Sequence, residues 1–338
     1  MKRLAVLVLV LMMGAVVTAF AAEQVEEKKK VETAVVEEKA EPETHYFAVQ
    51  LLYPLSTNKG MYDHTYANFS LLYGRIGRVT GVDMSYLASV VSHDMTGLQT
   101  SYVFAYTGQK LTGVAATGIA SVVKENTSGV QASGVVSYTG KELKGLQMSG
   151  VVNIAGNTSG MQMGVVNIAD DVKGVQLGLV NISDQMKGVP IGLVNISDNG
   201  GIEVAGWYSN LTAVNTGVRF RAGYVYTMLA FGGWNTEYEQ AKDESLSTSF
   251  YMGVRIPIWK FYVDMDAGYV ALDNDRIYRY DEYVDQMAIQ GRGILGVKLY
   301  EGFSVFGGGG VSYLLDAGRE FGTGSWEPLY LGGAAYEF

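Results

Sequence analysis

The sequence predicts an all-β chain, and three observations lead to this prediction. From His45 onward glycine, tyrosine, valine and serine are frequent, proline is rare, and amphipathic helical periodicity is hard to find. Runs of about ten residues are separated by short polar breaks, which is typical of strands long enough to cross a bilayer at a tilt. Related short units also recur along the middle of the chain.

The first residues have the pattern of a secretory signal peptide. A basic start at Lys2 and Arg3 precedes an apolar run, and Ala19-Phe20-Ala21 provides a small-x-small cleavage site. We therefore expect residues 1–21 to be removed. The mature chain loses two positive charges, so its formal net charge changes from -9 to -11. Because nucleic-acid binding requires a basic footprint, we expect no nucleic-acid partner.

Residues 22–44 differ from everything that follows them. They are rich in charge and contain neither glycine nor aromatic residues. Such a segment cannot bury enough apolar surface to offset the entropy of ordering it. We expect a disordered or loosely helical charged tail in the periplasm, where peptidoglycan or envelope proteins are the partners within its reach.

Strand alternation is clearest over residues 250–274. With a tight turn at Lys260-Phe261, Ile258 and Val263 share an apolar face, and Arg255 falls opposite Asp266 on the other face. One apolar and one charged face are typical of strands between lipid and a barrel lumen. A soluble sandwich has the same alternation, but the export signal favours the membrane.

The end of the chain, "YLGGAAYEF", resembles the C-terminal signal by which outer-membrane assembly machinery recognises β-barrel proteins. Gly333, Tyr336 and Phe338 carry this resemblance. It implies two partners, the barrel assembly machinery and outer-membrane lipid. Long polar stretches alternate with tight breaks in this third of the chain, as surface loops alternate with periplasmic turns. We expect a bacterial outer-membrane location with surface-exposed loops.

The central repeats open at glycines spaced by 14 to 16 residues. They begin at Gly97, Gly113, Gly129, Gly145, Gly160, Gly174 and Gly188. The last four units each carry an asparagine, at Asn153, Asn167, Asn181 and Asn195. Self-similarity at a fixed period indicates one supersecondary unit that stacks on its own copies.

Two architectures fit these repeats. In a barrel each unit is one strand and its turn, and the even period then requires an odd-length loop at Ser183–Lys187 or a bulge. In a parallel β-solenoid each unit is one coil, and the four asparagines form an internal ladder. We favour one antiparallel transmembrane β-barrel of about 16 strands, within 14–18, over residues 45–338 with repeats at 97–198. The alternative is a solenoid joined to a smaller barrel.

The units "GMQMGVVNIADD" and "GVQLGLVNISDQ" look like the short bacterial surface repeats of GxQxGxxN type that occur in exported proteins. The resemblance covers roughly residues 50–200. Its first units depart from the pattern, since Ala115 replaces glutamine and Ser121 and Ser137 replace asparagine. The resemblance implies a cell-surface or outer-membrane location and no established biochemical activity.

Catalytic and metal-binding patterns are not found in the sequence. The chain has His45, His64 and His93 and no cysteine, and no histidine pair has metal-ligand spacing. No serine lies in a nucleophile elbow, and "GGGG" at 307–310 opens no helix. We expect no enzyme, no cofactor and no metal site.

Charged side chains on the inward strand faces are the candidate functional residues. They are Arg219, Arg221, Arg255, Asp264, Asp266, Arg292 and Lys298. Inside a barrel they would shape the field of a pore or clamp it shut. The sequence thus predicts an outer-membrane β-barrel protein acting as a passive pore for small solutes. The alternative is a surface-exposed structural or adhesive protein with no transport role.

Overall fold

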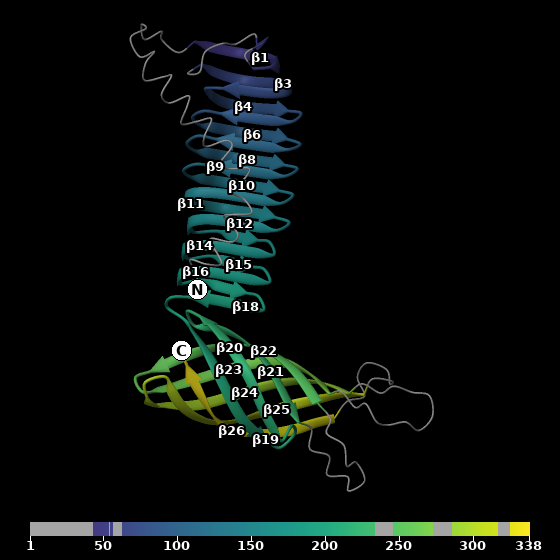
Figure 1. Cartoon of the computed structure of the whole chain (residues 1–338), viewed down its shortest axis with the longest axis vertical. Helices are drawn as coiled ribbons and strands as arrows, with labels where there is room; N and C mark the ends of the chain where they lie inside the picture. The colour runs from purple at the N-terminus through teal and green to yellow at the C-terminus, as the bar shows by residue number, and fades with distance from the viewer. Residues whose placement is uncertain (1–42, 54, 57–62, 234–245, 273–285, 317–324) are drawn as a thin grey trace, which may run out of the picture. The chain divides into compact units, whose positions relative to one another are not determined.

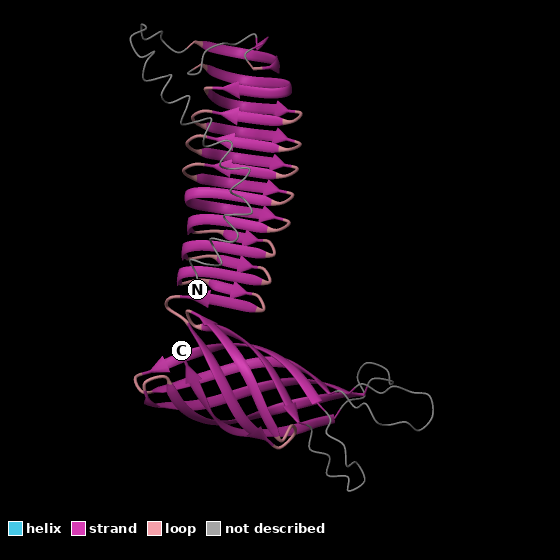
Figure 2. Cartoon of the chain, viewed as in Figure 1, coloured by secondary structure: helices cyan, strands magenta, loops and turns pink. Residues whose placement is uncertain are grey.

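The computed structural model describes residues 43–53, 55–56, 63–233, 246–272, 286–316 and 325–338. Within these ranges the chain forms strands, turns and bends and contains no helix (Figure 2). The all-β prediction is therefore confirmed for the described part. The expected signal peptide at 1–21 and all but the last two residues of the expected tail at 22–44 lie outside it.

The described chain forms a parallel β-solenoid followed by a closed antiparallel barrel (Figure 1). The predicted single barrel of about 16 strands is therefore wrong, and the alternative of a solenoid joined to a smaller barrel is correct. The physical reason lies in the repeats. Stacked coils place each residue beside its own equivalent, whereas antiparallel neighbours would place it beside a different residue.

The solenoid contains eighteen strands, most coils consisting of two. They are β1 (Thr44–Leu52), β2 (Leu55–Ser56), β3 (His64–Ile76), β4 (Arg78–Ser85), β5 (Ala88–Val91), β6 (Met95–Ser101), β7 (Phe104–Thr107), β8 (Leu111–Thr117), β9 (Ala120–Val123), β10 (Thr127–Ser133), β11 (Val136–Ser149), β12 (Val152–Thr158), β13 (Met161–Met163), β14 (Val166–Val172), β15 (Val175–Leu177), β16 (Val180–Met186), β17 (Val189–Ile191) and β18 (Val194–Ser197).

Parallel register replaces the expected hairpins in the repeats. Leu177 on β15 pairs in parallel with Ile191, fourteen residues later on β17. Residues Ser183–Lys187 form no turn of a hairpin, because β16 continues through Met186. The odd loop that a barrel needs is absent from this described segment, so the repeats are coils.

The stack also begins earlier than the glycine pattern indicated. Strands β1 and β3, which the sequence suggested as barrel strands, pair in parallel with each other, and β3 pairs with β4. Gly81 on β4 pairs with Gly97 and opens a unit that the sequence comparison missed. At Gly97 the φ angle is +120°, and a Cβ atom would lie 2.0 Å from the Gly81 oxygen. This column therefore accepts glycine alone.

The period shortens at two places, first where β11 shifts register against β12 between Thr139 and Glu142, and then at a corner that loses a serine. A longer coil has an extra serine there, such as Ser133, whose hydroxyl lies 2.8 Å from that of Ser137. Asparagine takes the Ser137 position from Asn153 onward, and the coils that open at Gly160 and later also omit the serine. Asn167 Nδ2 then reaches a backbone oxygen directly, 2.9 Å away on Leu177. In the coils without the serine, the asparagine amide thus makes a hydrogen bond to the backbone at this corner.

The barrel is closed by eight antiparallel strands. They are β19 (Gly201–Ser209), β20 (Val214–Ala222), β21 (Val225–Gly233), β22 (Leu246–Ile258), β23 (Phe261–Leu272), β24 (Gln286–Tyr300), β25 (Phe303–Asp316) and β26 (Ser325–Glu337). The chain enters at Gly201 and β26 ends at the same barrel end, since Glu203 pairs with Glu337.

In the β22–β23 hairpin the predicted inward and outward faces are confirmed, but the predicted register is wrong by two residues. Its turn lies at Trp259-Lys260, so Ile258 pairs with Phe261, and Arg255 pairs with Asp264 rather than Asp266. The shift leaves the faces unchanged because it is even. The outward side carries apolar residues that are exposed, among them Val254, Ile256, Ile258, Phe261 and Met265.

Candidate functional site

A column of glutamines runs through the solenoid interior. Gln131, Gln147, Gln162 and Gln176 are fully buried and pair in register. Gln147 Nε2 donates to Gln131 Oε1 across 3.0 Å, and the next two links are 2.9 Å long. Since a buried polar group without a partner is costly, these amides hold successive coils in register.

The glutamine column ends at Pro190, which pairs with Gln176 from the last strand on this face. Proline offers no side-chain amide, and Gln176 Oε1 has no hydrogen-bond partner within the described residues. Proline is typical of strands at the edge of a sheet, because it cannot donate to a further strand. Pro190 therefore marks the end of this stack.

A second column consists of the four asparagines of the repeats. Asn153 Nδ2 donates to Asn167 Oδ1 across 2.9 Å, and the following links to Asn181 and Asn195 are 2.9 and 2.8 Å. All four side chains are buried. This is the internal ladder expected for the solenoid alternative. Its amides donate toward the C-terminus, opposite to those of the glutamine column.

Asp83 occupies the glutamine column in an earlier coil, between Asn68 and Gln99. Asn68 Nδ2 donates to its Oδ1 across 2.7 Å, and the Ser89 hydroxyl donates to its Oδ2. Burial raises the pKa of the Asp83 carboxyl, and the hydrogen bonds from Ser89, Asn68 and Gln99 partly oppose that rise. A carboxyl group thus stands where other coils carry a neutral amide.

Inside the barrel four buried charged side chains form a cluster, and Arg221 Nε lies 4.0 Å from its Glu203. Arg255 binds Asp264 at two points, both 2.7 Å long, and also donates to Glu203. Arg219 Nη1 lies 3.0 Å from both Glu203 Oε2 and Asp264 Oδ2. None of the four is more than 4% exposed. Each charge is therefore neutralised by a neighbour, as a buried charge requires.

A second buried group lies around Asp266. Arg292 donates to its two carboxylate oxygens across 2.7 and 2.9 Å, and the Tyr226 hydroxyl donates across 2.6 Å. The Arg292 guanidinium also stacks over the Tyr251 ring, 3.4 Å from its centroid. Cation–π contacts of this kind stabilise a desolvated arginine.

The rest of the described interior is packed with apolar side chains. Trp207, Met228, Phe306, Leu329 and Leu331 belong to one buried cluster that also includes the Tyr251 and Tyr262 rings. An eight-stranded barrel is just wide enough for side chains to fill. The paired charges and this cluster both lie on the inward faces of the described strands.

The structure places the seven predicted lumenal residues in two groups. Arg219, Arg255, Asp264, Asp266 and Arg292 are buried in the clusters described above. Arg221 and Lys298 lie near the barrel end that holds Glu337, and both contact that carboxylate. Every member therefore faces inward or lies at the barrel mouth.

Sequence reasoning missed Glu203, the acid shared by Arg219 and Arg255. The alternation of β19 contained the signal, because Glu203 and Trp207 occupy the inward phase while Val204 and Tyr208 are exposed. The tyrosines that support the arginines were also missed. Their spacing from the arginines in the sequence gives no sign of the contact.

The residues of the predicted C-terminal assembly signal lie on the last strand, β26. Tyr336 and Phe338 are exposed, and their rings meet edge-on with centroids 5.0 Å apart. Gly333 pairs with Trp207, where a Cβ atom would lie 2.2 Å from the Gly206 oxygen. The expected alternation is present, and the role in assembly stays a prediction.

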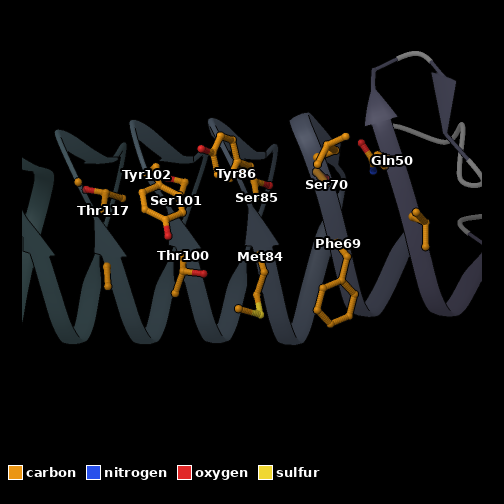
Figure 3. Close-up of a pocket in the computed structure, with 14 residues that line it drawn as sticks. Gln50, Phe69, Ser70, Met84, Ser85, Tyr86, Thr100, Ser101, Tyr102 and Thr117 are labelled. Atoms are coloured by element: carbon orange, nitrogen blue, oxygen red, sulfur yellow. The ribbon is translucent and has the colours of Figure 1, made fainter.

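A groove with a volume of about 760 Å³ crosses the first coils of the solenoid (Figure 3). The Tyr86 and Tyr102 rings lie side by side along it, tilted by 50° with centroids 5.0 Å apart. Its other labelled side chains come from successive coils and are Gln50, Phe69, Ser70, Met84, Ser85, Thr100, Ser101 and Thr117. Apolar and aromatic surface dominates, which suits an apolar ligand face more than an ion.

The described ranges hold no group of three or more histidine or acidic side chains suited to a metal ion. In that part of the chain no helix has the length and hydropathy that spanning a membrane requires.

No family model matches the chain, and no curated protein matches it. Among solved structures it is similar to the N-terminal β-barrel domain of Pseudomonas aeruginosa OprF, with 13% identity and a TM-score of 0.30 over 41% of this chain and 98% of that one. It is also similar to the Yersinia pestis outer membrane protein Ail, with 15% identity and a TM-score of 0.26 over 41% and 99%. The resemblance to surface repeats stays an expectation.

Proposed function

We propose that the chain is an outer-membrane anchor protein, in which the barrel spans the bilayer and the solenoid is a rigid arm attached to it. The two faces of the barrel carry this proposal. Outward side chains such as Phe231, Ile256 and Leu295 are apolar and exposed, while Arg219 and Asp264 are buried inside. This is the arrangement that lipid on the outside favours.

The connections of the barrel set the direction of the arm. Gly223-Tyr224, Trp259-Lys260 and Glu301-Gly302 are two-residue connections at one end. At the other end the strands are connected by residues 234–245, 273–285 and 317–324 and by one shorter connection, 210–213. Short turns are periplasmic and long loops extracellular in outer-membrane barrels. The solenoid joins at Gly201, on the short-turn end, so the arm belongs in the periplasm rather than on the cell surface.

A passive pore is the second candidate, and the paired interior disfavours it. Glu203, Arg219, Arg255 and Asp264 neutralise one another and leave no free charge in their cluster to attract an ion. The test is conductance of the purified full chain in planar bilayers. The anchor predicts no stable steps. Steps whose ion selectivity changes with Arg255→Glu would establish the pore.

Spanning of the membrane by the barrel is tested separately from conductance. A folded outer-membrane barrel migrates differently on gels before and after heating, so we expect the unheated full chain to show a shifted band. Extraction of the chain from membranes by carbonate, together with a single band at all temperatures, would contradict the anchor.

A further inference from the structure

An apolar ridge runs along one corner of the solenoid. Its nine residues, one from each coil, are Leu72, Leu87, Val103, Ile119, Val135, Val151, Val165, Leu179 and Leu193, and each is between 38% and 54% exposed. Backbone hydrogen bonds join successive members, as from Val135 N to Ile119 O across 2.9 Å. Contiguous exposed apolar surface of this extent marks an interaction site.

A trough without side chains lies beside the ridge. The residue before each of its last six members is a glycine, and these are Gly118, Gly134, Gly150, Gly164, Gly178 and Gly192. At Gly134 a Cβ atom would lie 1.9 Å from the Gly118 oxygen, so the column stays flat. Ridge and trough are parallel and adjacent. A two-fold rotation about an axis parallel to the stack of coils therefore sets the ridge of one copy against the trough of another.

The charges of the coils lie at the opposite corner. Apart from buried Asp83, residues 77–200 carry seven basic side chains (Arg78, Lys110, Lys124, Lys141, Lys144, Lys173, Lys187) and seven acidic ones (Asp94, Glu125, Glu142, Asp170, Asp171, Asp184, Asp198). Several pair between coils, as Lys141 does with Glu125 across 3.0 Å. This balance gives no attraction to an anionic lipid surface.

We propose that the ridge and trough bind the same surface of a second copy of this chain, side by side and in the same direction. A second copy has the same coil spacing of about 4.8 Å, so ridge side chains fit trough positions over the six coils that carry the glycines. The nine ridge residues and the trough supply on the order of 800 Å² per copy, the size of a standard interface.

The parallel direction rests on the proposed anchor function. Two barrels in one membrane leave their arms on the same side, and they raise the effective concentration of one arm near the other. In a parallel pair the two-fold axis runs parallel to the stack of coils. Each ridge residue then lies near the same residue of the other copy. In an antiparallel pair only residues near the middle do so.

The test uses single cysteines in the full chain, which has no native cysteine. Ile119→Cys, Val151→Cys and Leu179→Cys sample the ridge, and Ser159→Cys is the matched control at an exposed position near the charged corner. The chains are incorporated in phospholipid vesicles and treated with a short bis-maleimide. The expected result is dimer formation at all three ridge positions, at least tenfold above the control.

Other results would overturn the proposal. Cross-linking of Ile119→Cys and Val151→Cys, which lie one coil on either side of the middle residue Val135, without cross-linking of Leu179→Cys indicates an antiparallel pair. Equal cross-linking of the control indicates random collision. A polarity-sensitive dye on Val151→Cys that reports an apolar environment when each vesicle holds one chain indicates lipid contact instead. The heat-shifted gel band, measured on the same samples, shows separately whether the barrel anchor has folded.

Discussion

Asn181 Nδ2 lies 2.8 Å from Asn195 Oδ1, and this contact repeats one coil earlier between Asn167 and Asn181. The links make the buried asparagines a continuous chain of donors and acceptors. Each amide is the hydrogen-bond partner of the next, so the loss of any one asparagine leaves a buried neighbour without its partner. The solenoid thus has a polar interior that specifies its register.

Removal of one ladder member is expected to destabilise the solenoid alone. Asn167→Ala leaves Asn181 Oδ1 without its donor, and a buried group left unpaired costs roughly 1–3 kcal/mol. Hydrogen exchange of residues 161–186 measures the loss. All four tryptophans lie after residue 200, so tryptophan fluorescence should report an unchanged barrel. The exposed Asn157→Ala is the control, and equal exchange in the two variants would contradict the role of the ladder.

Extension of the glutamine column is expected to stabilise its last coil. Pro190→Gln places an amide where it can donate to Gln176 Oε1, which has no partner among the described residues. A hydrogen bond of this kind contributes about 0.5–1.5 kcal/mol. Slower amide exchange around Gln176 would be the sign. Pro190→Ala removes the ring without adding a donor, so an equal gain there would assign the effect to the backbone.

Asp83 is expected to make solenoid stability depend on pH. Its folded-state pKa is raised by burial, so the folded chain binds more protons than the unfolded one between the two pKa values. Stability from this group is therefore greatest below the usual value of 3.8 and falls as the pH rises through the folded-state pKa. Asp83→Asn should slow hydrogen exchange at neutral pH, with a gain that shrinks in acid. A gain independent of pH would refute this explanation.

The shared acid of the barrel cluster is expected to matter for barrel stability. Glu203→Gln removes the negative charge between Arg219 and Arg255, and breaking a buried pair costs about 3–5 kcal/mol. The temperature at which the unheated gel band converts should fall. Glu301→Gln, at an exposed turn, is the matched control. Conversion of both variants at the wild-type temperature would show that the cluster contributes little.

The sequence predicted the strands, their faces and most inward charges, but it favoured the wrong architecture. The alternation of side chains between the two faces of a strand is a local property. The inward positions of Arg255 and Asp264 could therefore be predicted from the sequence. The choice between barrel and solenoid depends instead on which residue lies beside Asn167. That neighbour is fixed by pairing between distant parts of the chain. The four asparagines pointed to it only through the ladder expected for the solenoid alternative.

The early coils and the shared acid were harder to find for related reasons. Asp83 and Asn68 replace glutamine in the same column, so their units carry no recognisable repeat. The even period of the repeats satisfied strand alternation equally well in both folds. Glu203 and Arg219 pair across the adjacent strands β19 and β20, so their contact depends on the register of that hairpin. The contact of Arg219 with Asp264 on β23 joins strands that are not neighbours, so its geometry depends on closure of the barrel.

The central claim is that the barrel holds the solenoid on the periplasmic side of the outer membrane. It is tested by labelling single cysteines with a membrane-impermeant maleimide in intact and permeabilised cells. Ser325→Cys lies where β26 begins, at the barrel end opposite the short turns, and Ser159→Cys lies on the solenoid. We predict labelling of Ser325→Cys in intact cells and of Ser159→Cys only after permeabilisation. Labelling of Ser159→Cys in intact cells, with Ser325→Cys protected, would contradict the proposed orientation.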